Sequence, residues 1–251
     1  MSRRLPLLAA LLILAAASAR ATSVEELIAR NLKARGGIDK IRAVQSMRTS
    51  GKLYAGGGDF SMEVSYAQMV KRPGIIRQEY SMQGLTSVTA YDGSLGWQVQ
   101  PFSGRLDPEK LAADDLKGLR LQADLDGPLV DYQAKGSKVE YLGTEDVDGT
   151  DAHKIKVTLK DGDIVYVYLD PDYFLEIRWT VQTRIRGVEM EYEQDLGNYE
   201  EVRGLMLPFS IESGAKGQPK SSKLTIEKVE INAPLDAALF RFPAPRAAAS
   251  K

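Results

Sequence analysis

Apolar and polar residues alternate along most of the chain after residue 46, which is the pattern of strands with one buried face. Between residues 61 and 69, for example, Met62, Val64 and Tyr66 share one face and polar residues occupy the other. Residues 164–169 are apolar on both faces, which predicts a strand covered on both sides. In total the pattern predicts about ten or eleven strands, over residues 47–51, 61–69, 75–82, 85–91, 95–100, 153–160, 164–169, 174–186, 188–196, 205–212 and 223–231.

Short turn signals separate these predicted strands. Gln83-Gly84 and Asp92-Gly93 favour tight hairpins, so neighbouring strands are expected to be antiparallel. The apolar parity shifts between Ile226 and Val229, which predicts a β-bulge at Glu227-Lys228. Most strands have one apolar and one polar face. We therefore expect a mainly β (α+β) fold with a single strongly curved antiparallel sheet, a half-open β-barrel whose concave face is covered by helices.

Helical spacing of apolar residues occurs in three places. Ser23 and Glu26 have capping-box spacing at the start of one segment, and Gly36-Gly37 ends it. A second, short helix is expected over residues 39–44. Residues 104–136 interrupt the strands, and Asp107-Pro108 there is a favourable helix start followed by leucines at helical spacing. This insertion must lie on the sheet to bury its leucines, so we expect it to form a helical lid.

A sheet of this size has more inward-facing apolar surface than two helices fill, which favours a cavity. Flexible methionines on that face suit an acyl chain of variable shape. For any one of these side chains, ordinary core packing is the simpler interpretation, so the case for a cavity depends on their number. The candidate lining residues are Met62, Val64, Tyr66, Ile76, Tyr80, Leu95, Trp97, Val99, Leu116, Leu121, Ile177, Trp179 and Met190.

For Trp97 the sequence predicts a more specific position. This residue follows the turn signal at Asp92-Gly93, on a strand that places Leu95, Trp97 and Val99 on one face. That strand runs directly into the insertion that we expect to be a lid. We therefore predict that Trp97 lines the mouth or wall of a lipid cavity.

The first 21 residues have the pattern of a secretory signal peptide. Arg3 and Arg4 precede an apolar run, and Ala19-Arg20-Ala21 is a small-x-small cleavage signal. The run is too short for a membrane span, and no later segment approaches about 18 uninterrupted apolar residues. We expect cleavage after Ala21, ordinary export to the periplasm, and a soluble single domain over residues 22–251.

Composition removes several classes of function. The chain contains no cysteine, which excludes disulfides, thiolate metal sites, cysteine nucleophiles and an acylated cysteine. The predicted signal peptide holds three arginines and no acidic residue, so 30 Lys and Arg against 34 Asp and Glu leave the remainder a net charge of −4. A mildly acidic chain lacks the excess of positive charge that nucleic-acid binding requires.

Polar residues give no convincing catalytic or metal site. His153 is the only histidine and has no fixed sequence partner, so we expect it to be packed or at a strand edge. Alternate acids over 189–195 and alternate lysines over 154–160 are typical of solvated faces that pair across strands. Gly56-Gly57-Gly58 is not a phosphate loop, because no Lys-Ser/Thr and no helix follow it. We predict no enzyme activity, no cofactor and no metal.

Several spaced motifs together resemble the periplasmic outer-membrane lipoprotein carriers and their relatives, the LolA/LolB-like superfamily. The resemblance covers nearly the whole chain after residue 21, and its strength lies in the order of the motifs. They are KARGG at 33–37, YDG at 91–93 followed by Trp97, LGTEDVDG at 142–149, DPD at 170–172, VRGLMLP at 202–208 and INAPLD at 231–236.

This resemblance implies a half-open β-barrel with an apolar cavity under a helical lid, which holds acyl chains of lipoproteins or other lipids. On that basis we predict a monomeric periplasmic carrier that moves a lipid or acylated lipoprotein between the inner and outer membranes, with transport partners at each. Because relatives include an envelope-stress sensor, the alternative is a sensor or scaffold of the same fold that binds a protein or lipoprotein.

Overall fold

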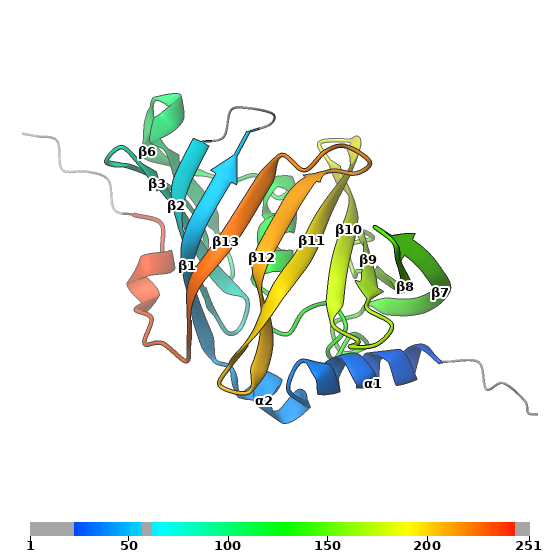
Figure 1. The fold of residues 1–251 in the computed structure, drawn as a ribbon. Helices are drawn as coiled ribbons and strands as arrows, with labels where there is room; N and C mark the ends of the chain where they lie inside the picture. The colour runs from blue at the N-terminus through cyan, green and yellow to red at the C-terminus, as the bar shows by residue number, and fades with distance from the viewer. Residues whose placement is uncertain (1–22, 57–61, 244–251) are drawn as a thin grey trace, which may run out of the picture.

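The computed structural model describes residues 23–56 and 62–243; the predicted signal peptide, part of the triple glycine and the last eight residues lie outside the described residues. Its helices are α1 (Val24–Ala34), α2 (Ile38–Ala43) and α3 (Lys117–Gln122), with 3-10 helical turns η1 (Pro101–Ser103), η2 (Asp114–Leu116) and η3 (Ala237–Phe240). The strands, shown in Figure 1, are β1 (Ser46–Ala55), β2 (Met62–Lys71), β3 (Ile75–Met82), β4 (Leu85–Tyr91), β5 (Gly96–Gln100), β6 (Arg105–Lys110), β7 (Lys138–Val147), β8 (Thr150–Thr158), β9 (Ile164–Leu169), β10 (Glu176–Ile185), β11 (Val188–Val202), β12 (Leu205–Ala215) and β13 (Ser222–Ile231).

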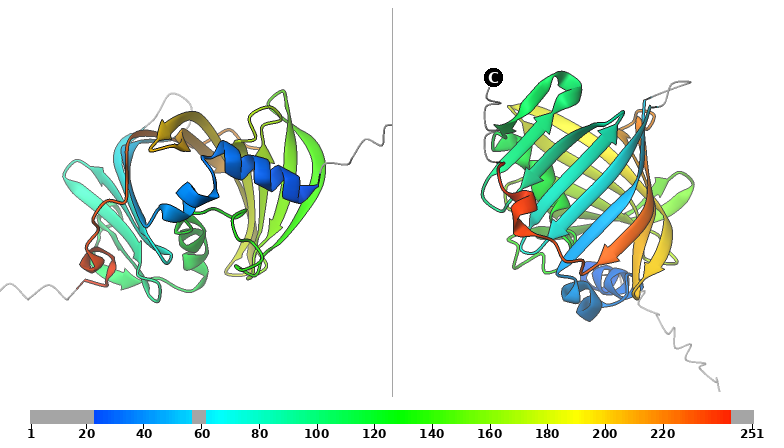
Figure 2. Two further views of the ribbon diagram at one scale, coloured as in Figure 1. Left: turned by 90° about the horizontal axis from the view of Figure 1, so that it is seen from below. Right: turned by 90° about the vertical axis from the view of Figure 1, so that its left-hand side faces the viewer.

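All of these strands belong to one 13-stranded sheet, in the order β6-β5-β4-β3-β2-β1-β13-β12-β11-β10-β9-β8-β7. Strands β1–β6 form one meander and β7–β13 another, and antiparallel pairing of β1 with β13 joins them. The sheet curls strongly but its edge strands β6 and β7 do not meet, so it is not closed into a barrel (Figure 2). The predicted single, curved, antiparallel sheet is confirmed.

Two strands were not predicted. Strand β6 pairs with β5, and Pro108 lies within it on the outer edge of the sheet, where a missing N–H costs no ladder hydrogen bond. Strand β7 is the opposite edge, paired with β8 and interrupted by an irregularity between Tyr141 and Thr144. These two edges account for the difference from the predicted strand number.

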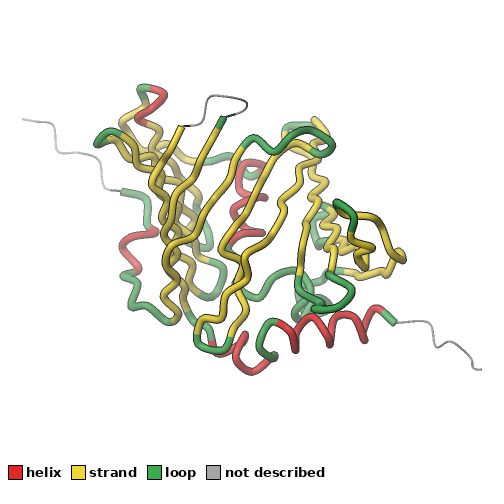
Figure 3. Tube along the Cα trace, viewed as in Figure 1, coloured by secondary structure: helices red, strands yellow, loops and turns green. Residues whose placement is uncertain are grey.

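The expectation that residues 104–136 form a helical insertion is largely wrong. Asp107-Pro108 starts no helix, because both residues lie in β6. Helical structure is limited to η2 and the six-residue α3, and most of the segment from 123 to 137 is turn or loop (Figure 3). Leu116 and Leu119 are nevertheless buried against the sheet, as the leucine spacing predicted.

The centre of the sheet contains the predicted bulge. The register of β1 with β13 shifts between Ser50 and Gly51, so that Ser50 faces Lys228, Gly51 faces Ile226 and Glu227 is the additional residue. A Cβ on Gly51 would lie 2.1 Å from the carbonyl oxygen of Thr225, so only glycine permits this approach of the two strands.

Helices α1 and α2 lie across one end of the curled sheet (Figures 1 and 2). Ser23 caps α1 through its side chain, which accepts from the backbone N–H of Glu26, as the sequence predicted. Leu27 and Ile28 of α1 pack on a core cluster that includes Ile155 and Val181. This end of the sheet is therefore closed by apolar packing.

Different segments of the chain cover the two faces of the sheet. The concave face, inside the curl, holds α3, and the convex face carries the C-terminal segment with η3 (Figure 2). Concave-face clusters pack against α1, α2 and α3, whereas Met69, Leu235 and Phe240 form a cluster under η3. We call strands β2–β6 the first wing and strands β7–β11 the second wing.

Candidate functional site

Helix α3 bridges the two wings across the concave face. Toward the first wing its contact is apolar: Leu116, Leu119 and Ala123 pack on Val70 and Ile76. The amide of Gln78 also donates to the side-chain oxygen of Gln122 at 2.6 Å.

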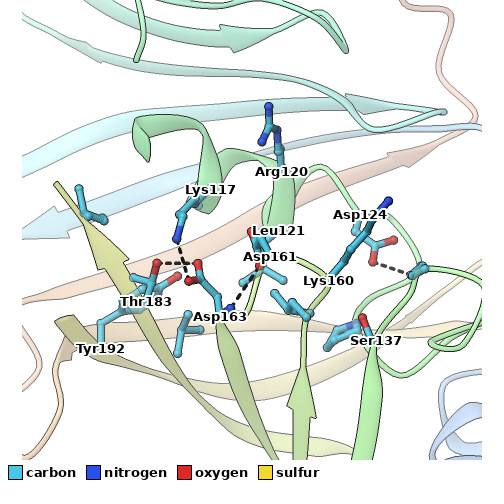
Figure 4. A pocket seen from close by; sticks show the side chains of 16 residues that line it. Lys117, Arg120, Leu121, Asp124, Ser137, Lys160, Asp161, Asp163, Thr183 and Tyr192 are labelled. Carbon is cyan, nitrogen blue, oxygen red and sulfur yellow. Dashed lines mark hydrogen bonds and ion pairs between the residues drawn. The ribbon is translucent and has the colours of Figure 1, made fainter. Parts of the chain in front are cut away.

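Toward the second wing the contacts of this bridge are polar. The ammonium of Lys117 donates to Asp163 at 2.8 Å, and the hydroxyl of Thr183 donates to the other oxygen of Asp163 at 2.6 Å (Figure 4). Just before α3, Asp115 forms an ion pair with Arg186 at 2.8 Å. One side of the bridge is thus held by burial and the other by exchangeable polar bonds.

A cavity of about 500 Å³, cavity A, lies between α3 and the second wing. Charged groups at its border are Lys117, Arg120, Asp124, Lys135, Lys160, Asp161 and Asp163, and its apolar lining is Leu121, Pro128, Leu159, Val181, Ile185 and Tyr192 (Figure 4). Lys135 pairs with Asp124 at 2.5 Å, and Arg120 lies over the ring of Tyr91. Burial raises the pKa of Tyr192 to about 12, so its phenol is neutral at physiological pH.

A second cavity of about 420 Å³, cavity B, lies on the other side of α3. Its lining comes from β1–β3, α3 and β11–β13, and none of the lining residues is charged. Burial raises the pKa values of the Tyr66 and Tyr80 phenols, whose rings lie 5.4 Å apart. The full lining is Met47, Thr49, Leu53, Tyr66, Gln68, Tyr80, Gln122, Gln194, Leu207, Pro208, Ile211, Ser213, Ser222, Leu224, Ile226 and Val229.

Some of the predicted lining residues come together on the concave face. Tyr66 and Tyr80 line cavity B, and Leu121 lines cavity A. Val64 lies on the same face of β2 as Tyr66. Ile76 and Leu116 lie in the cluster that holds α3.

Trp179 and the two methionines have other positions on this face. Trp179 packs at the edge of the α1 cluster and donates its indole N–H to Glu176 at 2.7 Å. Met62 and Met190 lie at strand ends and are 39 % and 50 % exposed. These three residues line neither cavity A nor cavity B.

The expectation that Trp97 lines the concave cavity is wrong. Trp97 lies on the convex face, 2 % exposed, and donates its indole N–H to the carbonyl of Phe240 at 2.8 Å. Val99 shares its cluster, and Ile177 packs in another cluster on the convex face with Val147 and Tyr168. Trp97 and Val99 share a face, as alternation predicts, but the register of β10 shifts between Glu176 and Arg178, so Ile177 and Trp179 lie on opposite faces. Both faces of these strands are covered, so alternation alone cannot say which one is concave.

Leu95 lies on neither face of the sheet. It lies in the turn between β4 and β5, where its backbone N–H donates to the side chain of Asp92 at 2.8 Å. Asp92 accepts from Ser94 as well, and its pKa is lowered by these backbone and side-chain hydrogen bonds against the opposing effect of burial. Leu95 therefore belongs to the turn rather than to either cavity wall.

Sequence reasoning missed most of the polar residues of the site. Nothing in the DGD turn around Asp163 distinguishes it from an ordinary surface turn, yet its side chain connects α3 with β10. Ile211, Leu224 and Ile226 were on apolar faces of predicted strands, and recognition that β12 and β13 lie at the centre of the sheet would have placed them in cavity B.

His153, the only histidine of the sequence, lines neither cavity A nor cavity B. His153 packs between Tyr141 and Phe174, and its pKa is lowered by burial and by the charge of Arg30. Within residues 23–56 and 62–243, no group of three His, Cys, Asp or Glu side chains is placed to hold a metal ion. In the same ranges no helix has the length and apolar character needed to cross a membrane.

Comparison with known proteins identifies the architecture. No family model and no curated protein matches the sequence. Among solved structures, a LolA superfamily protein from Nitrosomonas europaea superposes with a TM-score of 0.57 at 15% identity, over 84% of this chain and 96% of that one. The chain has a LolA-like fold.

Two further structures have the same LolA-like fold. A domain named for outer-membrane lipoprotein sorting, from Vibrio parahaemolyticus, matches with a TM-score of 0.57 at 12% identity, over 85% of this chain and 97% of that one. A DUF1329 family protein from Desulfovibrio piger matches with a TM-score of 0.59 at 13% identity, over 87% and 97%. At these identities the likeness concerns the fold.

Proposed function

We propose that this LolA-like chain is a periplasmic carrier that binds a lipid, or the acyl chain of a lipoprotein, in the concave-face cavities and moves it between the inner and outer membranes. The observation that supports this most directly is cavity B. Its wall is mainly apolar, its polar groups are uncharged amides, phenols and hydroxyls, and no ionic group lines it. Such a wall accepts hydrocarbon without desolvating a charge.

The size of the cavities agrees with this ligand class. Volumes of about 420 and 500 Å³ fall within the roughly 300–1,000 Å³ of small-molecule sites. Each methylene group removed from water contributes roughly 0.8 kcal/mol, so a long acyl chain binds well without specific polar contacts. The charged border of cavity A is available to the polar end of such a ligand.

Helix α3 is the element best suited to act as the lid. Its apolar side remains attached to the first wing through Leu116 and Leu119, while its polar side is held by Lys117 and Asp163. Loading would break the polar bonds first, because water replaces them at little cost, and would leave the apolar attachment intact.

The predicted signal peptide and the absence of cysteine support an exported protein that is not itself acylated on cysteine. The neighbour named for lipoprotein sorting supports the same class of cargo. A sensor or scaffold that binds a protein partner needs no cavity inside the sheet, so the two cavities favour the carrier over this alternative.

Tryptophan substitutions that fill the cavities provide the test. Ile211→Trp fills cavity B and Leu121→Trp fills cavity A, and each should weaken binding of a fluorescent fatty acid by roughly tenfold. The matched control is Glu212→Trp, next to Ile211 on the opposite face of β12, which should bind as the wild type does. Equal binding by all four proteins would refute an acyl-binding concave face.

Native mass spectrometry of the protein purified from its own cell envelope identifies the cargo. A carrier should retain lipid or an acylated peptide, and the Ile211→Trp protein should retain less. Recovery of a stoichiometric protein partner with no lipid would instead establish the sensor or scaffold alternative.

A further inference from the structure

Exposed apolar side chains of the described residues gather at one end of the molecule. This end, which we call the open rim, comprises the hairpin ends between β3 and β4, β5 and β6, and β10 and β11, together with the outer ends of β1 and β2 (Figure 1). Among the large exposed apolar residues of ranges 23–56 and 62–243, only Leu142 and Tyr173 lie elsewhere. Those at the open rim are Tyr54, Met62, Leu85, Phe102, Leu106, Val188 and Met190.

The open rim is opposite the end that α1 and α2 close (Figure 1). Cavity A is lined at its rim side by Lys160 and Asp161, between β8 and β9, and by Ile185 at the end of β10. Cavity B is lined by Ser213 and Ser222, near the rim ends of β12 and β13. Both cavities thus extend toward the rim that carries the exposed apolar residues.

Several charged side chains at the open rim form ion pairs within the protein. Arg105 pairs with Glu109 and Arg184 with Glu189, and Lys216 pairs with Glu191. These pairs leave no surplus of positive charge among them. Attraction between this rim and a partner would therefore come from the apolar tips rather than from electrostatics.

The shape of the rim distinguishes between occupants. Phe102 and Leu106 are exposed on the hairpin of β5 and β6, Leu85 on that of β3 and β4, and Val188 on that of β10 and β11. These three hairpins end at separate points around the sheet end (Figure 1). A peptide or helix requires a continuous apolar groove, whereas separated protruding tips fit a planar apolar phase behind a polar surface.

We propose that the open rim docks on the surface of a lipid bilayer, with the hairpin tips inserted among the lipids and both cavities opening toward the membrane. The docking itself does not depend on the cargo. It rests on the proposed function only in its consequence, since an acyl chain would then pass between membrane and cavity without crossing water.

Flotation of the full exported chain with phosphatidylcholine vesicles tests the docking. The double variant Phe102→Ser/Leu106→Ser and the single variant Val188→Ser should lower the partition coefficient, the double variant by roughly tenfold or more. Tyr173→Ser is the matched control, since Tyr173 is 74 % exposed at the opposite end, and it should partition as the wild type does. All of these residues are exposed, so unchanged thermal unfolding is expected and verifies the fold.

Three outcomes would overturn the proposal. They are failure of the wild type to float, equal loss in the Tyr173→Ser control, and binding that requires added phosphatidylglycerol and disappears in high salt. The last result would mean electrostatic attraction, which the paired charges of the rim do not predict.

Binding of a soluble fluorescent fatty acid by the same proteins separates this inference from the proposed function. Rim variants should bind the probe normally while they lose vesicle binding. A protein that binds the probe but not vesicles would refute the docking alone. A protein that binds vesicles but not the probe would refute the carrier function alone.

Discussion

Trp97 is a structural residue that joins the C-terminal segment to the convex face of the sheet. Its indole N–H donates to Phe240, the ring of Phe242 meets it edge-on with centroids 6.4 Å apart, and the guanidinium of Arg77 lies 5.6 Å from the ring centre. Arg77 in turn donates to the carbonyl of Leu239 at 2.8 Å. Loss of this ring would leave both a void and an unpaired carbonyl.

Trp97→Ala is therefore expected to reduce the free energy of unfolding by about 3–5 kcal/mol, measured by chemical denaturation. Fatty-acid affinity of the folded fraction should not change, because Trp97 lines neither cavity A nor cavity B. The milder change Trp97→Phe should restore part of the stability. Loss of fatty-acid affinity with intact stability would contradict this assignment.

The positions of Trp97 and Tyr66 show how far residue-level prediction could go. Alternation correctly placed Tyr66 on one strand face with Val64, and Trp97 on one strand face with Val99. It could not tell the concave from the convex face, because the C-terminal segment covers Trp97 as fully as α3 covers Ile76. That distinction depends on which face of the sheet residues 233–242 pack against, and these residues are distant in sequence from Trp97.

At the scale of elements, α3 has an apolar attachment to the first wing and a polar attachment to the second wing. The ion pair of Lys117 with Asp163 is largely shielded from solvent, and the hydrogen bond to Asp163 raises the pKa of Lys117. Its loss would loosen α3 from the second wing without disturbing Leu116 and Leu119.

Lys117→Met should accelerate dissociation of bound fatty acid several-fold and increase hydrogen exchange over residues 114–122, since α3 opens more often. Lys223→Met is the matched control, because Lys223 forms an ion pair of the same length, 2.8 Å, with Glu212 but is exposed. The control should leave both quantities unchanged. Stopped-flow dissociation rates identical in the two variants would exclude α3 as the lid.

Arg72 organises the segment that follows α3. Its guanidinium donates to both oxygens of Asp126, at 2.6 and 2.5 Å, and to the carbonyls of Val44 and Ile41. It thereby connects the β2–β3 turn, α2 and the loop after α3. The hydrogen bond from Arg72 holds the pKa of Asp126 below the ordinary value of 3.8.

Arg72→Met should lower the free energy of unfolding by about 2–4 kcal/mol at neutral pH. A lowered folded-state pKa means that the carboxylate stabilises the fold above the ordinary pKa and loses this effect as pH falls through the folded-state value. The difference between variant and wild type should thus be constant at neutral pH and shrink below pH 3.8. Arg42→Met, which breaks an exposed pair with Asp131, should leave the stability nearly unchanged, because solvent screens that pair. A difference independent of pH would contradict the role of Asp126.

The segment from 104 to 136 marks the limit of element prediction. Leucine spacing correctly indicated that this segment buries Leu116 and Leu119 on the sheet. A favourable N-cap and proline at Asp107-Pro108 nevertheless lie in a strand, because pairing with β5 overrides local helix preference. Local sequence signals thus show that a segment can form a helix, but pairing with a neighbouring strand determines whether it does.

At the scale of the molecule, the two ends of the curled sheet differ. One end is filled by α1 and α2, while the other end carries exposed apolar tips above two cavities. Charged residues on the outer face pair across neighbouring strands, as Lys154 does with Glu145 and Arg178 with Asp195. The closed base and the apolar rim make the two ends of the molecule different, and the proposed carrier would use this difference when it meets a membrane.

The pairing of β1 with β13 also determines when the sheet can form. These strands lie at opposite ends of the described chain, yet they occupy the centre of the sheet and join its two wings. Contacts between residues so distant in sequence make folding slow, and the sheet is incomplete until β13 has been synthesised and released. A chain that crosses the membrane unfolded would keep its translocation competence throughout synthesis, because the strand that completes the fold emerges among the last.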